Sequence, residues 1–369
     1  MVPKKLSRRH KHRSRRPGLL LLALCVLAPV LAACGQDGAD HTGVLLLPDA
    51  AANGKAWDWT ARCQFGPSAR NACEPSGPDL GVAQLNGDEW NLGGGTTTAG
   101  SLGMSVTSPG ALLVRGDFPS APPCVQSSCL APSAYTWVRG YPNVLYGINL
   151  CHEATSPPES KILRLPMQVK AIPPDFIGTT TYAAHSGQVT YDVAYDLWLN
   201  PSATKRPCRT DGTLELMIWT DYDEKALLPA SMEVGTASIP FSIAGAVRPD
   251  TQAWSIYASN IFAKGQTAPW GGAVWVVLNA ADIVAKGTVS GNLGSVLSAV
   301  GSLFQNNYGW SDFAKRYWLD SIPFGTEFGP QDGALTGTGS SYFSLKLSSY
   351  CLTVRTTLSR AGCGSLQQG

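Results

Sequence analysis

The residues best suited to chemistry in this sequence are three acids, Asp196, Glu215 and Glu327. Carboxyl groups donate or accept protons when their surroundings set a suitable pKa. Glu215 belongs to a segment with the two-residue period of a β-strand, which puts Met217 and Trp219 on the same face as the acid. This mixture of acid, thioether and indole indicates the floor of a ligand-binding groove. An ordinary outward-facing acid on a sandwich strand remains open as an alternative.

A second acidic strand pattern precedes it at residues 189–198. Asp192, Asp196 and Trp198 fall on one face, and the alternate positions of this segment are apolar. Asp196 and Glu215 are 19 positions apart, through a connection that contains prolines and an Asp-Gly turn. This spacing predicts two neighbouring antiparallel strands of one sheet.

Glu327 ends an extended run and lies between Gly325 and Gly329. Considered alone, a glutamate between two glycines is explained well enough as a loop residue in a turn. Its place among the candidate site residues therefore depends on the two other acids.

The elements that must hold these acids are short strands. Charged residues make up 15% of the chain and aromatic residues 9%, with 39 Gly and 26 Pro, a composition that favours strands and loops over a helical bundle. We expect an all-β fold, an antiparallel two-sheet sandwich or jelly roll, in a single domain over residues 56–369. The strands predicted from alternation and turn residues are 111–115, 134–139, 144–150, 168–172, 188–199, 214–219, 238–244, 252–258, 273–279 and 341–354.

One helix is expected, at residues 280–305. Apolar residues recur there at helical spacing, although Gly287, Gly291 and Gly294 weaken the first half. The apolar stripe of this helix should pack on the back of a sheet.

The first 33 residues have the layout of a secretory signal peptide, with a basic start, an apolar run and a Leu-Ala-Ala-Cys ending at Cys34. This ending resembles a bacterial lipobox, which predicts a lipid anchor on Cys34; plain cleavage after a small residue is the alternative. Residues 34–55 are then a tether, and the protein is exported, as a cell-surface lipoprotein or into the medium. The formal net charge of +2 includes eight Lys and Arg residues ahead of the first acid, Asp37. Without them 20 basic residues face 26 acidic ones, so no nucleic-acid partner is expected.

Ten cysteines minus Cys25 and Cys34 leave eight, an even number that predicts disulfides in an exported chain. Their pairing does not follow from the sequence, and short separations make Cys124–Cys129 and Cys351–Cys363 the first guesses. No metal site is expected, because the cysteines lack neighbouring histidines and paired Cys-x-x-Cys spacing.

Several stretches together resemble glycoside hydrolase family 12, the compact jelly-roll endoglucanases. The resemblance covers residues 83–355, and its most specific part is Glu-Leu-Met-Ile-Trp followed later by Gly-Thr-Glu. The chain departs from the family after Gly-Thr-Glu, where Phe-Gly-Pro replaces the usual Pro-Phe. The matching stretches are Val138-Arg-Gly-Tyr-Pro-Asn143, Val193-Ala-Tyr-Asp-Leu197, Leu214-Glu-Leu-Met-Ile-Trp219 and Gly325-Thr-Glu327, with weaker matches at Asn86-x-x-x-Trp90, Trp254-x-Ile-Tyr257 and Val274–Leu278.

The resemblance implies a role for each acid: Glu215 as nucleophile, Glu327 as acid/base and Asp196 as helper acid. It also implies a concave substrate groove. Trp90 at the far end of that groove would stack on a sugar, although a core position explains Trp90 equally well. The expected substrate-binding residues are Asn86, Trp90, Tyr141, Asn143, Trp198, Met217 and Trp219.

The implied activity is that of an endo-acting retaining β-1,4-glucanase on cellulose-type, mixed-linkage or xyloglucan chains. Such an enzyme needs two carboxyl groups about 5–5.5 Å apart. It needs no cofactor, and its substrate partner is a β-glucan. We also expect a monomer, and the predicted lipid on Cys34 makes a membrane its second partner, although such an anchor is unusual for the family. Two alternatives stay open: a non-catalytic glucan-binding lipoprotein of the same fold, and the related jelly-roll xylanases. The three acids argue against a pure binding protein, because clustered carboxylates repel one another.

Overall fold

The structure is a computed structural model. The described residues all belong to one compact unit, residues 36–369. They are residues 59–66, 69–73, 84–86, 100–107, 111–118, 138, 140–147, 165–187, 189–203, 212–223, 226, 228–244, 252–259, 272–330 and 341–354.

Two β-sheets make up the described fold, and they confirm the expected all-β, two-sheet jelly roll. The first has eight strands in the order β12-β15-β8-β18-β5-β4-β1-β2. All of its described pairings are antiparallel. Its strands are β1 Trp59–Gly66, β2 Ala69–Cys73, β4 Gly100–Thr107, β5 Ala111–Phe118, β8 Phe176–Gly187, β12 Phe241–Ile243, β15 Lys286–Asn292 and β18 Ser341–Val354.

The second sheet has ten strands in the order β11-β13-β14-β10-β9-β16-β6-β3, with β17 paired to β9 and β7 to β16. One pairing, β10 with β14, is parallel, which the antiparallel expectation did not include. Its strands are β3 Gln84–Asn86, β6 Asn143–Gly147, β7 Met167–Gln168, β9 Val189–Asn200, β10 Leu214–Tyr222, β11 Glu233–Ile239, β13 Gln252–Ala258, β14 Gly272–Leu278, β16 Trp318–Gly325 and β17 Phe328–Pro330.

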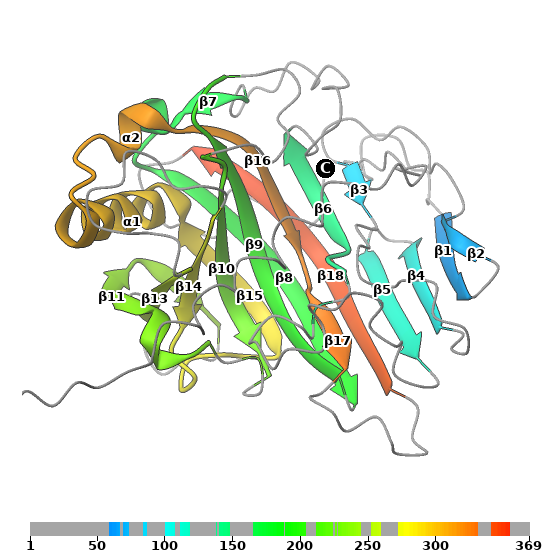
Figure 1. The fold of residues 1–369 in the computed structure, drawn as a ribbon. Coiled ribbons are helices and arrows are strands. Elements are labelled where there is room, and N and C mark those ends of the chain that lie inside the picture. The colour runs from blue at the N-terminus through cyan, green and yellow to red at the C-terminus, as the bar shows by residue number, and fades with distance from the viewer. Residues whose placement is uncertain are drawn as a thin grey trace, which may run out of the picture. The chain divides into compact units, whose positions relative to one another are not determined.

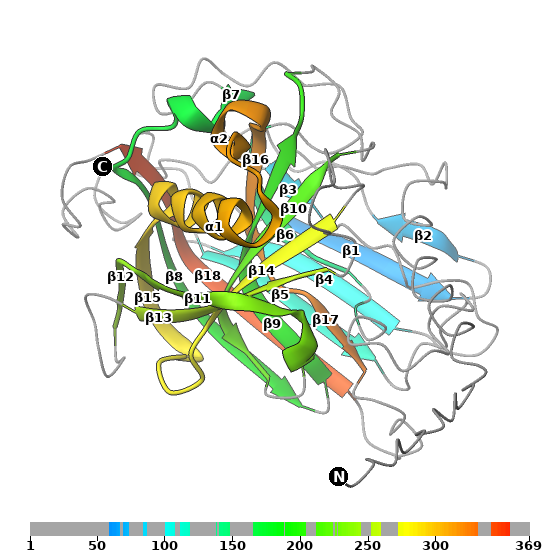
Figure 2. The ribbon, with the colours of Figure 1, turned by 60° about the vertical axis from the view of Figure 1, so that its left-hand side comes forward.

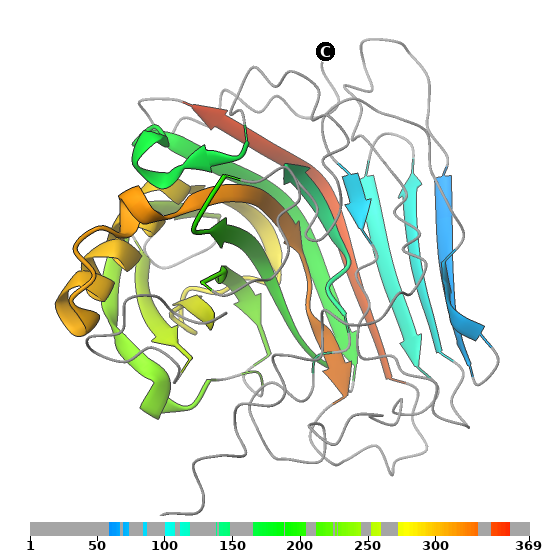
Figure 3. The same ribbon diagram turned by 45° about the horizontal axis from the view of Figure 1, so that its top comes forward.

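The main core lies where the two sheets face each other. Figure 1 shows β9, β10 and β16 crossing in front of β8, β15 and β18. Leu214, Leu216 and Ile218 of β10 are buried in this core, as their alternation predicted. Phe343, Leu345 and Leu347 of β18 fill it from the opposite sheet. Figure 3 shows the pronounced curvature of the strands of both sheets, including β16 in orange.

The helix prediction was wrong in its first half. Residues 286–292 form strand β15, and the helix α1 runs only over Leu293–Tyr308. Two of the glycines that weakened the pattern, Gly287 and Gly291, belong to the strand, and Gly294 lies in the first turn of α1. An added Cβ on Gly291 would collide with the ring of Phe241, its register partner on β12. The glycine therefore makes room for an aromatic ring on a sheet surface.

The helix itself begins where Asn292 caps it, since the Asn292 side chain accepts a hydrogen bond from the N–H of Ser295 at 2.8 Å. It ends at Gly309, which has a positive φ of 76°. Helix α1 contacts β11 of one sheet and β8 of the other, and Figure 2 shows it above β11 and β14. Its apolar stripe lies in the main core, as expected. The described residues also form three shorter helices, α2 Phe313–Arg316, η3 Val169–Ala171 and η5 Ala230–Met232.

Two other predicted strands differ from the strands in the structure. Residues 169–171, expected to be extended, form the 3-10 helix η3. The strand expected at 238–244 is split, because β11 ends at Ile239 and β12 begins at Phe241. Proline at position 240 lacks the N–H that a continuous ladder requires. The strand expected at 134–139 lies largely outside the described residues.

Candidate active site

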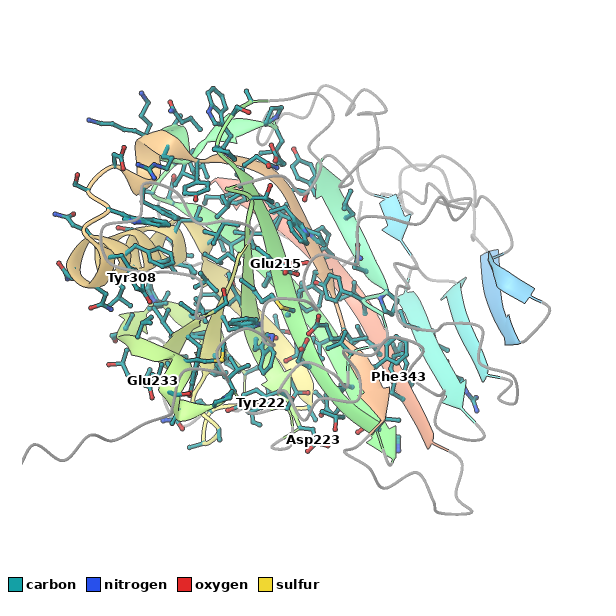
Figure 4. The ribbon with its side chains drawn as sticks, in the orientation of Figure 1. Glu215, Tyr222, Asp223, Glu233, Tyr308 and Phe343 are labelled. Carbon is teal, nitrogen blue, oxygen red and sulfur yellow. The ribbon has the colours of Figure 1, made fainter. Side chains whose placement is uncertain are left out.

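Strands β9 and β10 are antiparallel neighbours, which confirms the prediction from the Asp196–Glu215 spacing. Both acids lie on the face that points away from the main core. Asp196 is buried, whereas Glu215 is partly exposed. Figure 4 shows Glu215 on β10 near the middle of the sheet. The register partners on this face are Glu215 with Trp198, Met217 with Asp196, and Trp219 with Ala194.

Glu327 lies between β16 and β17, opposite Asp192 of β9. The Asp192 N–H donates to the Glu327 carbonyl at 3.1 Å, and the Glu327 N–H donates to the Asp192 carboxyl oxygen Oδ1 at 3.4 Å. The Thr326 hydroxyl donates to the Asp192 carbonyl at 2.6 Å. These bonds fix the backbone of Glu327 against β9.

Gly325 has a steric reason to be glycine. A Cβ at this position would collide with the carbonyl of Pro142 and lie 2.7 Å from the Cβ of Asn143. Position 325 pairs with Asn143 on one side and with Ala194 on the other. The glycine of the Gly-Thr-Glu motif thus lets the chain at Pro142 and Asn143 approach the backbone closely, two residues before Glu327.

Burial raises the pKa of Glu327 well above its usual value. The next causes are the charge of Asp192 and a hydrogen bond with its carboxyl group, then the charges of Glu215 and Asp196. Asp192 is fully buried, and this burial raises its pKa to about 7 although the hydrogen bonds with Glu327 lower it. Four carboxyl groups therefore act on one another at this site.

Two further side chains, from Trp198 and Tyr141, make hydrogen bonds on this part of β9. The indole N–H of Trp198 donates to Oδ2 of Asp196 at 3.1 Å. The buried hydroxyl of Tyr141 donates to the carbonyl of Ala194 at 2.8 Å. The pKa of Tyr141 is raised, first by burial and then by the charges of Asp196, Asp192 and Glu327. Tyr141 therefore stays neutral and adds no charge to the cluster.

An apolar cluster lies on the same face of the sheet as the acids. Met217 and Trp219 are both buried in it, and Trp219 is only 1% exposed. Leu228 and Met232, from the segment after β10, cover this cluster together with Trp275 of β14. Met217 is the register partner of Asp196, so the apolar cluster borders the acids on this face. Burial beside apolar side chains removes water from a carboxyl group and raises its pKa.

Glu215 and Glu327 occupy different positions along β9. Glu215 lies opposite Trp198, whereas Glu327 lies opposite Asp192, six residues away along the strand. The charge of Glu215 nevertheless raises the pKa of both Glu327 and Asp192, so the two glutamates are within electrostatic range.

A second polar group lies further along the same sheet face, where Asn200 pairs with the start of β16. The Asn200 amide donates to the carboxyl group of Asp320, and the Thr213 hydroxyl donates to Asn200 at 2.7 Å. Burial raises the pKa of Asp320 to about 7. This group, Asn200–Asp320–Thr213, contains one carboxyl group bound to an amide.

The remaining predicted substrate-binding residues are only partly described. The Asn143 amide is buried and donates to the Tyr141 carbonyl at 2.6 Å. The backbone of Asn86 pairs with Asn143 at the edge of the sheet. Trp90, Cys34 and the guessed pairs Cys124–Cys129 and Cys351–Cys363 involve positions outside the described residues or side chains, so these stay predictions.

One acid of the cluster, Asp192, was not among the predicted site residues. Its strand period placed it on the Asp196 face, which is the only signal the sequence offered. Its contacts with Thr326 and Glu327 join positions 134 and 135 residues apart, which no local pattern reveals.

Glu327 is thus a buried carboxyl group with a raised pKa, held among other acids on a sheet face that also carries an apolar cluster. Among the residues that the structure describes, no group of His, Cys, Asp and Glu side chains could hold a metal ion. No helix in this part of the chain is long and apolar enough to cross a membrane.

Comparisons with known proteins complete the description of the site. Solved structures similar to this chain include two endoglucanases and a xyloglucanase. The endoglucanase Cel12A from Rhodothermus marinus is 16% identical with a TM-score of 0.47, over 74% of this chain and 92% of its own. A family 12 xyloglucanase from Bacillus licheniformis is 17% identical with a TM-score of 0.48, over 74% and 93%. A metagenome-derived family 12 endoglucanase is 17% identical with a TM-score of 0.46, over 82% and 98%.

A search of curated protein sequences finds no match. Residues 125–354, however, match the sequence profile described as Glycosyl hydrolase family 12. This span contains Asp192, Asp196, Glu215 and Glu327, the four acids of the site. Because the match extends over more than half of the chain, the protein belongs to glycosyl hydrolase family 12 and is a glycoside hydrolase.

Proposed function

We propose that the protein is an endo-acting, retaining β-1,4-glucanase that cleaves cellulose-type, mixed-linkage or xyloglucan chains. The observation that carries this proposal is the state of Glu327. It is a buried acid whose pKa is raised by burial and then by neighbouring acids, among them Glu215. A general acid must hold its proton at the working pH, while the nucleophile beside it must be ionised.

In the proposed reaction Glu215 attacks the anomeric carbon as a carboxylate, and the bond to the leaving sugar breaks. Glu327 gives its proton to the leaving oxygen and later removes a proton from the attacking water. Asp196 lies diagonally beside Glu215 on the neighbouring strand and serves as helper acid. Trp198 supports Asp196 through its indole N–H and lines the groove next to Glu215.

The other proposed substrate-binding residues fall into a buried set and a set at the end of the groove. Met217 and Trp219 form a buried wall behind the acids, and Tyr141 and Asn143 are buried on the β6 side. Asn86 and Trp90 would bind sugar at the end of the groove remote from cleavage. Cys34 would carry the lipid that holds the exported domain at the cell surface.

The test is reducing-sugar release by the purified protein on carboxymethyl-cellulose, barley β-glucan, xyloglucan and xylan. We expect activity on at least one β-1,4-glucan, and we expect Glu215→Gln to lower it by at least about 10⁴-fold, because the covalent step has lost its nucleophile. Asp320→Asn is the matched control: it changes a buried carboxyl group on the same sheet that is bound to an amide, and it should retain activity.

Near-normal activity of Glu215→Gln would refute the assignment of the nucleophile. Binding to glucan without any hydrolysis would instead favour the non-catalytic glucan-binding protein, and activity on xylan alone would favour the xylanase alternative. Proton NMR of the first product decides the stereochemistry: a retaining enzyme releases the β-anomer first, and the α-anomer would contradict the double displacement.

A further inference from the structure

Asp192 and Glu327 are held together by more than their charges. The two residues exchange a pair of bonds, in which each backbone N–H donates to an oxygen of the other residue, at 3.1 and 3.4 Å. A third bond, from the Thr326 hydroxyl to the Asp192 carbonyl, clamps the connection between β16 and β17 onto β9. These bonds fix the backbone of Glu327 against β9 and tie the Asp192 carboxyl group to it.

Both carboxyl groups are removed from water. Asp192 is 0% exposed and Glu327 is 7% exposed. Two buried carboxylates that lie together cannot both ionise at low cost, so such a pair retains a shared proton. No basic side chain faces the pair among the described groups that act on it. Those groups are Glu215 and Asp221 on β10, Asp196 on β9 and Tyr141 ahead of β6.

We propose that Asp192 is a positioning residue for the acid/base Glu327, with which it forms a buried carboxyl pair that retains one proton, so that Glu327 stays in its proton-donating form. This inference rests on the proposed function of Glu327. The Asp192 carboxylate accepts the hydrogen bond from the protonated Glu327, and this bond orients the acid in the resting enzyme. The hydrogen bond raises the pKa of Glu327 and lowers that of Asp192, as the pairing requires.

The first experiment compares the pH dependence of kcat/KM in the wild type and in Asp192→Asn. The variant keeps the size and the backbone bonds of residue 192 but removes the negative charge next to Glu327. Glu327 should then lose its proton more readily, so the alkaline limb of the profile should move down by about one pH unit or more. A merely structural role would lower kcat and leave that limb in place.

The matched control is Asp221→Asn. Asp221 is also a buried carboxyl group, but it accepts its hydrogen bond from the Tyr191 hydroxyl at 3.3 Å and acts on Asp192, not through a bond to Glu327. Its variant should move the alkaline limb by less than half as much as Asp192→Asn. A limb in Asp192→Asn that is unchanged, or that moves to higher pH, would overturn the proposal.

A second measurement needs neither catalysis nor the Asp192→Asn variant. Carbon-13 NMR of the side-chain carboxyl groups in the full wild-type protein, with Glu327 identified by its absence in Glu327→Gln, follows the pair directly. We expect Glu327 and Asp192 to titrate in two linked steps, with one proton retained above pH 7. Two independent single-step titrations would refute the pair. If the protein hydrolyses no glucan, this titration still decides the inference separately from the proposed function.

Discussion

Two buried polar groups share one face of the ten-stranded sheet, and they differ in what surrounds the acid. In the first, Glu327 lies against Asp192 within range of Glu215. In the second, Asp320 lies against the amide of Asn200, which is held in turn by Thr213. Burial raises the pKa of both Glu327 and Asp320, so a raised pKa does not by itself mark a catalytic acid.

The difference between the two groups lies in the partner. An amide neighbour satisfies a carboxyl group in either protonation state and stabilises local structure. A carboxyl neighbour cannot do so without sharing a proton, and the resulting repulsion costs stability. Such an arrangement is expected where a proton must be available for chemistry. The comparison therefore predicts that substitutions in the first group change catalysis and that substitutions in the second change stability.

The largest contrast is expected from Glu327→Gln. Without a proton donor, cleavage of natural β-glucan should fall by about 10²–10⁴-fold, because the leaving sugar departs poorly without protonation. An aryl glucoside with an acidic phenol leaving group needs little protonation, so its first cleavage step should fall far less. Parallel rate measurements on both substrates check this, and equal losses would show that Glu327 is not the acid.

The sequence predicted the strands of the two sheets better than the contacts between those strands. Residues 252–258 alternate clearly, and strand β13 has those bounds. Strand β8 went unpredicted because its threonines, alanines and glycines give no apolar period, although it pairs with both β15 and β18. Its burial depends on its neighbours, which a local pattern does not contain.

In the site, too, local patterns placed residues on strand faces but did not reveal contacts between distant residues. The faces of β9 and β10 followed from period alone, so Asp196 and Glu215 could be placed together from the sequence. The motif around Glu327 could be matched to a family, but its partner Asp192 could not be found, because strand pairing joins positions 135 residues apart. Apolar residues at helical spacing misled the helix prediction before residue 293, although Gly287 and Gly291 counted against a helix. The room that Gly291 leaves for the ring of Phe241 is a tertiary feature, which the local pattern does not contain.

The second prediction concerns the Asn200–Asp320–Thr213 group. The pKa of Asp320 is about 7 in the folded protein against an ordinary 3.8, so the folded state holds its proton more tightly than the unfolded chain. Its contribution to stability is present at about pH 4 and is lost as the pH rises to about 7. An asparagine at position 320 cannot ionise, so Asp320→Asn avoids the stability that the wild type loses when Asp320 gives up its proton. The variant should therefore be more stable than the wild type at pH 8, by at most about 4 kcal/mol.

Chemical denaturation of wild type and Asp320→Asn at pH 4.5 and pH 8 tests this, with hydrolysis assayed alongside. The variant should show a weaker fall in stability with pH, although not a flat curve, since Asp192 and Asp221 also have raised pKa values. A pH dependence identical to that of the wild type would show that Asp320 ionises freely in the folded protein. If Asp320→Asn lost much of its activity while it stayed fully stable, Asp320 would belong to the catalytic machinery. The Asn200–Asp320–Thr213 group would then not differ in role from the group of Asp192 and Glu327.

The smallest effects come from a matched pair of threonines, one in each group. Thr213 and Thr326 are both 1% exposed. The Thr213 hydroxyl donates to Asn200 at 2.7 Å, and the Thr326 hydroxyl donates to the Asp192 carbonyl at 2.6 Å and lies 3.1 Å from the Glu327 carbonyl. Valine has nearly the same shape and lacks the hydroxyl, so each Thr→Val change should cost about 1 kcal/mol of stability. Thr213→Val should lower stability only and leave kcat unchanged. Thr326→Val also loosens the backbone that carries Glu327, so it should lower kcat several-fold as well. Measured at equal folded fractions, equal kcat in the two variants would mean that the clamp on β9 does not position the acid, and that the two groups differ only in their charges.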